Sequence, residues 1–470
     1  MHVIETDYLV VGTGASGLAF VDALINRADV DVVMVDRRHR PGGHWLDAYP
    51  FVRLHQPSAT YGVDSRELGN GRIDTSGPNA GYYELATGAE VVNYFGRVLD
   101  EGLLPSGRVR FYGLSDYLGG DSDGHHFRSL LTGAETTVKV RKRVVDAAYI
   151  QPSVPSRHTP SFEVDDGVRF VSPNRLAELS EPGGGYTIIG SGKTAMDTCG
   201  WLIENGVPAD NIRWVKPREP LMLNRAFTQP RELVASYMQL LSSLVRASAA
   251  AEEPIDFAGQ LESDGVLVRI HSDVEPTAFR GGTISMGEVE RIRQVSNVVR
   301  QGYVRRIGTD RVTLADGAIE SRRGEVFVDC TARGVPSLSL RPVFEPGRIT
   351  MEFLTLGNAP YSAAIIGVVE ALGDDDGERN RVCPPMAFDG TLVGFPGLVL
   401  PALTGTTARA AVPEINTWNA GSRMNPTRGA QDRRDDPTIA KAFEVLAEHT
   451  APALSNLARL VAAGAAPARE

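Results

Sequence analysis

Two glycine-rich turns, widely separated in the chain, constrain the fold more than any other feature of the sequence. The first is Gly12-Thr13-Gly14-Ala15-Ser16-Gly17, and the second is Gly190-Ser191-Gly192-Lys193-Thr194-Ala195. Each turn follows a β-branched apolar run and opens a stretch with helical patterning, which is the order of a βαβ dinucleotide-binding unit. The sequence therefore predicts an α/β fold with two Rossmann-like dinucleotide-binding domains.

The first turn has the residue types that a dinucleotide pyrophosphate requires. Gly12 permits the tight bend, Gly14 lets the phosphates approach the backbone, and Gly17 lets the helix pack closely on the strand. The helix N-terminus adds unpaired N–H groups and a partial positive charge. Asp36 ends the next predicted strand, where a carboxylate accepts hydrogen bonds from ribose hydroxyls. The predicted contacts are Gly12, Thr13, Gly14, Ala15, Ser16, Gly17, Asp36 and Arg37.

The second turn differs from the first at the end of its following strand. Instead of an acid, the sequence there reads Lys216-Pro217-Arg218. A carboxylate would repel a ribose 2′-phosphate, whereas these two cations would pair with it, so this site is expected to prefer NADPH to NADH. A P-loop is excluded, because that motif would need a glycine in place of Thr187. The predicted contacts are Gly190, Ser191, Gly192, Lys193, Thr194, Lys216 and Arg218.

Composition narrows the classes of function. The 470 residues allow two to three domains, and the net charge of −10 without a basic run argues against a nucleic-acid partner. Only three cysteines occur and none forms a C-x-x-C pair, which argues against a redox-active dithiol and fits a reducing compartment. Neither a signal peptide nor an apolar run of about 20 residues is evident, so we expect a cytoplasmic protein without a membrane partner.

Between the two turns lie two further motifs. The segment Pro41-Gly42-Gly43-His44-Trp45 follows the second strand, and Tyr49-Pro50-Phe51-Val52-Arg53-Leu54-His55 comes next. Together with the turns, they resemble the two-dinucleotide flavoprotein monooxygenases, which include the flavin-containing, N-hydroxylating and Baeyer–Villiger enzymes. The resemblance covers most of residues 1–220, with a weaker match near Val326–Ala332.

The resemblance implies FAD at the first turn and NADPH at the second. In that family NADPH reduces the flavin, and O2 then gives a C4a-(hydro)peroxyflavin that oxygenates a small-molecule substrate. The Baeyer–Villiger fingerprint is missing, since Phe162–Leu179 has neither its His nor its Trp, so oxygenation at N or S is favoured over ketone oxidation. The family's Ala-Thr-Gly elements are also altered, to Val145–Ala148 and Asp329–Ala332.

The resemblance also implies an interrupted first domain. We expect an FAD domain that begins with residues 1–172, an NADPH domain at 173–332 with a helical insertion at about 230–284, and residues 333–470 that complete the FAD domain and end in a helical tail. Glycine and aspartate at 119–124 predict a turn, and 421–436 predicts an exposed loop. Four apolar segments are expected to form one closing sheet: Val266–Ile270, Gly302–Ile307, Arg311–Leu314 and Val326–Asp329.

The candidate active-site residues lie in the loop after the first βαβ unit. Gly43, His44 and Trp45 are expected beside the flavin. Gln56 could hydrogen-bond flavin heteroatoms, His55 could carry a proton because its ordinary pKa lies near neutrality, and Arg53 could bind an anion. Alternatively, Arg53 and His55 only tie a long loop to its scaffold. No motif predicts a metal site.

Two predicted helices add to this picture. Asn358–Ser362 precedes a helical pattern at Ala363–Leu372, and the start of that helix could lie against the flavin pyrimidine, where reduced FAD carries negative charge. In the helix after the second turn, Lys193 and Asp197 are four residues apart, so we expect them to contact each other on one helix face.

Two other functions stay open at this stage. One is a flavoprotein reductase or dehydrogenase that passes electrons on without inserting oxygen. The other is a nucleotide-binding sensor that signals through its C-terminal half. The sequence specifies neither the substrate nor the oligomeric state.

Overall fold

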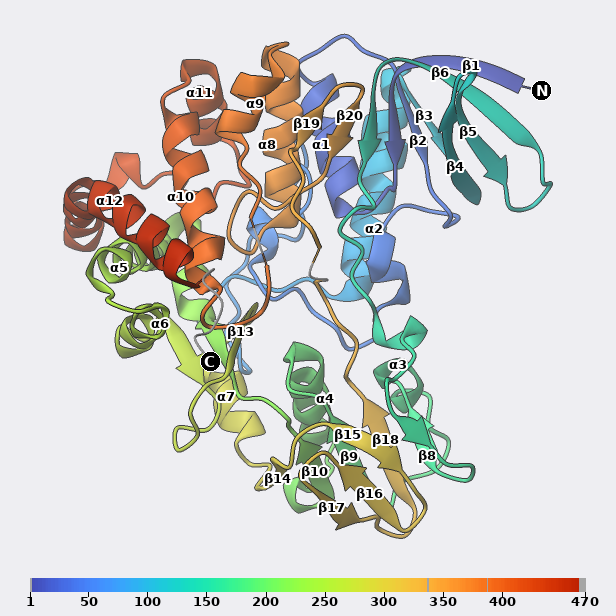
Figure 1. Ribbon diagram of the computed structural model, residues 1–470, viewed down its shortest axis with the longest axis vertical. Coiled ribbons are helices and arrows are strands. Elements are labelled where there is room, and N and C mark those ends of the chain that lie inside the picture. Colours follow the sequence, from blue (N-terminus) through green and yellow to red (C-terminus); the bar gives the residue numbers. More distant parts are fainter. Residues whose placement is uncertain (1, 336–337, 387, 465–470) are drawn as a thin grey trace.

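Two sheets, each carrying one glycine turn, form the frame of the protein; the first is mixed with a parallel centre, and the second is parallel (Figure 1). The computed structural model describes residues 2–335, 338–386 and 388–464. The strand order is β19-β20-β6-β1-β2-β3 in the first sheet and β14-β10-β9-β18-β8 in the second. The predicted α/β class with two Rossmann-like units is therefore confirmed.

The first sheet is built from segments far apart in the chain. Strand β1 pairs in parallel with β2 and β6, and β20 pairs in parallel with β6. Because β20 follows the whole second unit, the predicted interruption of the first domain is confirmed at the level of strand order. The strands are β1 (His2–Val11), β2 (Val32–Val35), β3 (Val109–Tyr112), β6 (Glu135–Asp146), β19 (Phe344–Glu345) and β20 (Arg348–Thr350).

A hairpin extends the edge of this sheet. It consists of β4 (Ser115–Asp121) and β5 (Gly124–Ser129), which pair with each other, and β5 also pairs with β6. The prediction of a turn over residues 119–124 was thus too long, because Gly119 and Gly120 face His126 and His125 across the strands. Glycine is uncommon in strands, so the glycine-rich sequence indicated a turn although these residues pair in a hairpin.

The second sheet contains the second turn. Its strands are β8 (Arg169–Val171), β9 (Gly185–Ile189), β10 (Ile212–Val215), β14 (Asn297–Val299) and β18 (Glu325–Asp329). Helix α4 (Lys193–Glu204) joins β9 to β10, which completes the second βαβ unit. Since β8 belongs to this sheet, the second unit gathers residues on both sides of the predicted boundary at 172/173, and the domain boundaries stay a prediction.

Two smaller sheets flank the second unit, and the prediction of one closing sheet was wrong. One holds β11 (Pro220–Asn224), β12 (Leu267–Arg269) and β13 (Ala278–Ile284). The other holds β7 (Glu163–Val164), β15 (Val304–Ile307), β16 (Arg311–Leu314) and β17 (Gly317–Glu320). The four predicted segments are strands, but they divide among three sheets because a short apolar strand does not encode its partner.

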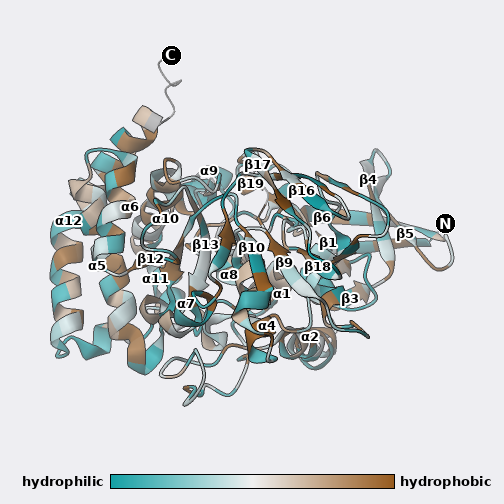
Figure 2. Cartoon of the chain, turned by 90° about the horizontal axis from the view of Figure 1, so that it is seen from below, coloured by the Kyte–Doolittle hydropathy of each residue, from teal (hydrophilic) through white to brown (hydrophobic). Residues whose placement is uncertain are grey.

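Helices of the insertion and of the C-terminal part pack together beside this frame. The longest pair, α5 (Val234–Ala250) and α12 (Pro437–Gly464), lies side by side in Figure 2, each with apolar and polar stretches. Val234 and Met238 of α5 pack with Ile439 and Ala442 of α12. Further helices of this part are α6 (Pro254–Ser263), α9 (Asp376–Val382), α10 (Phe395–Ala410) and α11 (Pro413–Gly421), whereas α7 (Met286–Ile292) packs against α4.

The helix after the first turn is enclosed on two sides. Helix α1 (Ala15–Ile25) is buried from Gly17 to Ile25, between the sheet and α8 (Ala359–Leu372). The two helices meet closely at Gly367, where a Cβ would lie 2.6 Å from the carbonyl oxygen of Phe20. Such burial fixes the position of the first turn, because α1 has no room to shift.

The segment between α11 and α12 is not the exposed loop that the sequence predicted. Ser422 and Met424 are buried, and the guanidinium of Arg423 donates to the backbone of residues 59–63. In the part of the chain that the structure covers, no helix combines the length and apolar character needed to span a bilayer.

Candidate functional site

The first glycine turn is held in shape by Asp36. The N–H and the hydroxyl of Thr13 both donate to Asp36 Oδ2 at 2.7 Å, and the N–H of Arg38 donates to Oδ1 at 2.8 Å. A carboxylate offers about four acceptor positions, so Asp36 keeps capacity for ribose hydroxyls while it fixes the turn. The structure thus brings Asp36 to the turn, and its contact with ribose stays a prediction.

The glycines of this turn serve close packing. A Cβ on Gly17 would lie 2.2 Å from the carbonyl oxygen of Gly12, so α1 sits directly against the turn. The loop that contains Gly43 crosses over the turn, since a Cβ there would lie 2.9 Å from Gly14 Cα. No side chain caps α1 at Gly14, which leaves the first N–H groups of the helix available to an anion. These groups include the N–H of Ala15 and Ser16.

The second turn repeats this geometry with one difference. Gly190 has a left-handed φ of 134°, and a Cβ on it would meet the carbonyl oxygen of Cys330 at 2.5 Å. At Gly192, by contrast, a Cβ would have no described atom within 4 Å, so one side of this turn is open. Ser191 Oγ accepts a hydrogen bond from the N–H of Arg218 at 3.2 Å, which places Arg218 at the turn.

Lys193 does not project freely toward a phosphate. Its Nζ forms ion pairs with Asp197, one helical turn along α4, and with Glu288 at 2.8 Å. Burial alone would lower the pKa of Lys193, but these two carboxylates raise it above its ordinary value. The expected Lys193–Asp197 contact is present, whereas the expected phosphate contact would require Lys193 to leave two carboxylates. Its neighbour Thr194 stays a predicted contact, at the first turn of the helix.

The amino group of Lys216 also has its partners within the protein. It is 1% exposed, forms an ion pair with Glu219, and lies 4.6 Å from the centre of the Trp214 ring. Burial lowers the pKa of Lys216 to about 8 despite the attraction of Glu219. The structure therefore gives Lys216 a structural partner, and it does not bring its amino group to the open side of the turn.

In the described part of this site, the cations that remain without a carboxylate partner are arginines and not Lys216. Burial lowers the pKa of Arg280, and the positive charges of Arg218 and Arg333 lower it further. Among the residues that the structure describes, none of the three has a carboxylate partner within 4 Å, and the buried Nε of Arg280 has no hydrogen-bond acceptor. The arrangement leaves donors available for an anion.

The two units meet where the loop after Trp45 contacts α4. The hydroxyl of Tyr49 donates to Asp197 Oδ2 at 2.8 Å, and the Phe51 ring stacks on Trp201 at 4.6 Å between centroids. This contact joins the loop of the first turn to the helix of the second.

The predicted catalytic residues fall into two groups. His55 and Gln56 lie half-buried at the junction, whereas Arg53 is exposed and donates to the carbonyl oxygen of Leu85 at 3.0 Å. Burial, together with Lys193, lowers the pKa of His55 to about 4, so its imidazole is neutral at neutral pH. The amide of Gln56 has no hydrogen-bond partner among the described side chains and backbone groups, so it remains available to a ligand.

A network of charged side chains holds the backbone at His55. Arg225 is 1% exposed, donates to the carbonyl oxygen of His55 at 3.0 Å and contacts Glu288 at 2.5 Å. Glu288 itself is fixed by a capping box, in which it accepts from the N–H of Ser285 at 2.8 Å. Sequence reasoning missed Arg225 and Glu288, because no motif marks them and their partners lie far away in the chain.

The remaining predicted flavin neighbours occupy the loop over the first turn. Trp45 Nε1 donates to the hydroxyl of Tyr61 at 2.8 Å, and the ring of His44 lies 5.2 Å from that of Trp45. Burial and the charge of Arg38 lower the pKa of His44 to about 4. Arg37 has a side chain that is 72% exposed and pairs with Asp116, so its predicted contact with the cofactor stays a prediction.

The start of α8 also reaches this loop. Asn358 caps the helix by accepting from the N–H of Tyr361, and its amide donates to the carbonyl oxygen of Thr60 at 3.1 Å. The helix begins at Ala359, four residues before the predicted start at Ala363. Its N-terminus therefore lies beside the loop that contains Thr60, and its contact with the flavin stays a prediction.

Two further kinds of chemical group are clusters of metal-ligating side chains and thiols. The described residues hold no group of three or more His, Cys, Asp or Glu side chains suited to a metal ion. Cys199, Cys330 and Cys383 are free and buried. Burial raises the pKa of each thiol, which keeps them protonated.

Comparison with known proteins finds one matching family model and several similar solved structures. A family model described as an NAD(P)-binding Rossmann-like domain matches residues 10–63, which contain the first turn, Asp36 and the loop to Gln56. Among solved structures, the chain is similar to a flavin-containing monooxygenase from Stenotrophomonas maltophilia, with 17% identity, 89% of this chain and 99% of that chain covered, and a TM-score of 0.45. It is also similar to a cyclohexanone monooxygenase in its open form, with 13% identity, 99% and 97% coverage, and a TM-score of 0.49.

Two mycobacterial proteins are much closer in sequence. They are "Uncharacterized protein Rv2000" of Mycobacterium tuberculosis and "Uncharacterized protein Mb2023" of Mycobacterium bovis. Each is 40% identical over 423 residues, covering 90% of this chain and 78% of the relative. With its two Rossmann-like units and this degree of identity, the chain belongs to the same family as these mycobacterial proteins.

Proposed function

We propose that this protein is an FAD- and NADPH-dependent monooxygenase that transfers one oxygen atom from O2 to a nitrogen or sulfur atom of a small molecule. The observation that carries the proposal is the junction at which Tyr49 and Phe51 join the loop of the first turn to α4 of the second. FAD would supply the chemistry of hydride acceptance and oxygen activation, with NADPH as the source of two electrons.

The residues of both turns fit these cofactors. The uncapped start of α1 and the position of Asp36 suit the pyrophosphate and ribose of FAD. The open side of Gly192 suits the approach of the NADPH pyrophosphate. The unpaired donors of Arg218 and Arg280 suit its 2′-phosphate. These fits support the proposal residue by residue.

The residues at the junction would have distinct roles. Gln56 would hold the reacting group by its free amide, while Trp45 and Tyr61 would exclude water from one side. The low pKa of His55 makes it a neutral hydrogen-bonding group rather than a proton donor at neutral pH. Arg225 would position this segment through the His55 carbonyl.

The test is a sequence of spectroscopic measurements on the purified protein. It should be yellow, lose the flavin absorbance when NADPH is added anaerobically, and form an oxygenated product from an amine or a thioether after O2 is admitted. Formation of H2O2 alone with every candidate would favour a reductase or oxidase. Bound FAD without reduction by NADPH would favour a nucleotide sensor, and a colourless protein that takes up no FAD would refute the proposal.

Coenzyme selection gives a first prediction. We expect R218A/R280A to raise KM for NADPH about 100-fold, because each charge-assisted hydrogen bond is worth about 1.5 kcal/mol, while KM for NADH changes little. Lys216→Ala is the comparison: it should weaken both coenzymes equally, because it removes the nearest cation from the buried Glu219 and leaves only the longer contacts with His271 and Arg300. The measurement is steady-state kinetics with both coenzymes. An equal rise of KM for NADPH and NADH in R218A/R280A would contradict the assignment of the two arginines to the 2′-phosphate.

Gln56 gives a second prediction. We expect Gln56→Leu to lower the yield of oxygenated product per NADPH at least ~10-fold, since one hydrogen-bonding group in a dry site contributes strongly, while anaerobic flavin reduction continues. Gln239→Leu on the exposed face of α5 is the matched control. Oxygenated product and H2O2 are measured together. If Gln56→Leu leaves the yield of oxygenated product per NADPH unchanged, Gln56 does not belong to the active site.

A further inference from the structure

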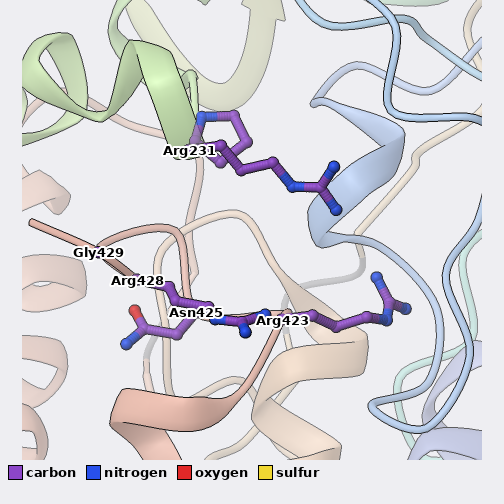
Figure 3. A pocket seen from close by; sticks show the side chains of 6 residues that line it. Arg231, Arg423, Asn425, Arg428 and Gly429 are labelled. Atoms are coloured by element: carbon purple, nitrogen blue, oxygen red, sulfur yellow. The ribbon is translucent and has the colours of Figure 1, made fainter.

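A cavity of about 330 Å³ lies where the start of the insertion meets the segment between α11 and α12 (Figure 3). None of its lining residues belongs to either glycine turn. Half of them are arginines and none is acidic, although the protein as a whole carries a net charge of −10. The lining residues are Pro230, Arg231, Arg423, Asn425, Arg428 and Gly429.

Two of the arginines keep their positive charge without a carboxylate partner. Arg423 donates to the carbonyl oxygens of Ala59, Tyr61 and Val63 at 2.7, 2.7 and 2.9 Å and to the hydroxyl of Tyr94 at 3.4 Å, so its hydrogen-bond partners are neutral groups. Among the residues that the structure describes, the guanidinium of Arg428 has neither an ion pair nor a hydrogen bond. A concave surface lined by one sign of charge concentrates counter-ions.

The third arginine is held in an unusual backbone conformation. Arg231 has a φ of 56°, in the left-handed region that favours glycine. Arg433 stabilises this conformation by donating to the carbonyl oxygens of Arg231 at 3.2 Å and Glu232 at 2.9 Å. The guanidinium of Arg231 lies 2.5 Å from Glu67. Backbone strain that is held by surrounding contacts is found preferentially at ligand sites.

We propose that this cavity binds the oxyanion group, a carboxylate or a phosphate, of a small anionic ligand. Guanidinium forks donate two parallel hydrogen bonds to such groups, and Figure 3 shows Arg231 on one side of the space with Arg423 and Arg428 on the other. At about 30 Å³ for each water molecule, the cavity has the volume of roughly eleven waters, which suits a small metabolite and not a dinucleotide. The site does not depend on the proposed redox function.

The ligand would also contact the loop of the candidate active site through one residue. Arg423 lines the cavity and at the same time holds the carbonyls of residues 59–63, which follow Gln56. Asn358 at the start of α8 is bound to the same loop through Thr60. Only the Arg423 side chain would thus separate an anion in the cavity from the loop of residues 59–63.

Calorimetric titration with inorganic phosphate and, separately, with citrate tests the proposal. The protein is first saturated with FAD and NADP+, so that neither turn competes for the anion; a chain that takes up neither cofactor is titrated as it is. We expect one of the two probes to bind, which identifies phosphate or carboxylate chemistry. Arg428→Ala should weaken that binding about tenfold or more, and so should Arg231→Gly, whose new residue tolerates the left-handed backbone.

Two further variants sharpen the result. Glu67→Gln frees Arg231 from its carboxylate and should strengthen binding, whereas Arg305→Ala, an exposed arginine on β15, should leave it unchanged. Arg428 is exposed and its loss should not affect folding, so it decides the outcome even if Arg231→Gly is unstable. The proposal is overturned if neither probe binds, or if binding is the same in Arg428→Ala as in the unaltered protein.

Discussion

Gly17→Ala is expected to abolish FAD binding and to destabilise the first unit by more than about 3 kcal/mol. The added Cβ would lie 2.2 Å from the carbonyl oxygen of Gly12 and 3.3 Å from the Cβ of Ala147. Such a contact forces α1 away from the turn. Because α8 packs against α1 at Gly367, the helix cannot move without breaking a second interface. Flavin content after purification and urea unfolding measure the two effects.

Gly192→Ala is the matched control for the second turn. Nothing among the described atoms lies within 4 Å of the position of its Cβ, and its φ of −85° is ordinary for alanine. The free energy of unfolding should therefore change by less than about 1 kcal/mol. The methyl group would instead occupy the space through which the pyrophosphate of NADPH approaches, so KM for NADPH should rise. A stable, yellow Gly17→Ala protein would contradict the helix–turn packing.

The sequence predicted those parts of the fold that local pattern encodes. The strand at Arg311–Leu314 was placed correctly, and the helix predicted at Ala363–Leu372 ends where α8 ends, because apolar runs and helical periodicity extend over a few residues. The partner strands of β12 and of the β15–β16 pair could not be predicted in this way. β12 pairs with β11, which precedes the whole of α5 and α6, and β15 pairs with β7, which lies more than a hundred residues earlier in the chain.

The same distinction applies to the candidate site. The glycines of both turns follow a motif, and the structure places them as the motif requires. Lys193 and Lys216 were predicted as phosphate partners from their sign and position alone. A pattern of charges does not show which carboxylates lie nearby, and here Glu288 and Glu219 pair with these lysines. The arginine from β13, Arg280, escaped notice because the insertion carries no recognisable motif.

Glu288→Ala is expected to destabilise the protein by about 3 kcal/mol and to loosen the junction between the two units. Glu288 lies 2.8 Å from Lys193 and 2.5 Å from Arg225, whose side chains are 9% and 1% exposed. Removing the carboxylate leaves two buried cations with weaker partners. Arg225 also holds the carbonyl of His55, so the segment before Gln56 should lose its position and the rate of flavin reduction by NADPH should fall.

The pH dependence separates this charge effect from a loss of packing. Burial opposes ionisation of Glu288, but Lys193 and Arg225 hold its pKa far below the value of about 4.3 in an unfolded chain. A carboxyl group whose pKa is lowered by folding stabilises fully above its unfolded pKa, and that contribution is lost as the pH falls toward the folded pKa. The stability difference between the unaltered protein and Glu288→Gln should therefore be constant above about pH 6 and shrink between about pH 5 and pH 3. Glu290→Gln, an exposed acid on the same helix, should show no such difference at any pH. A difference for Glu288→Gln that is independent of pH would mean that the side chain acts by its shape, and that the two cations are neutralised by other groups.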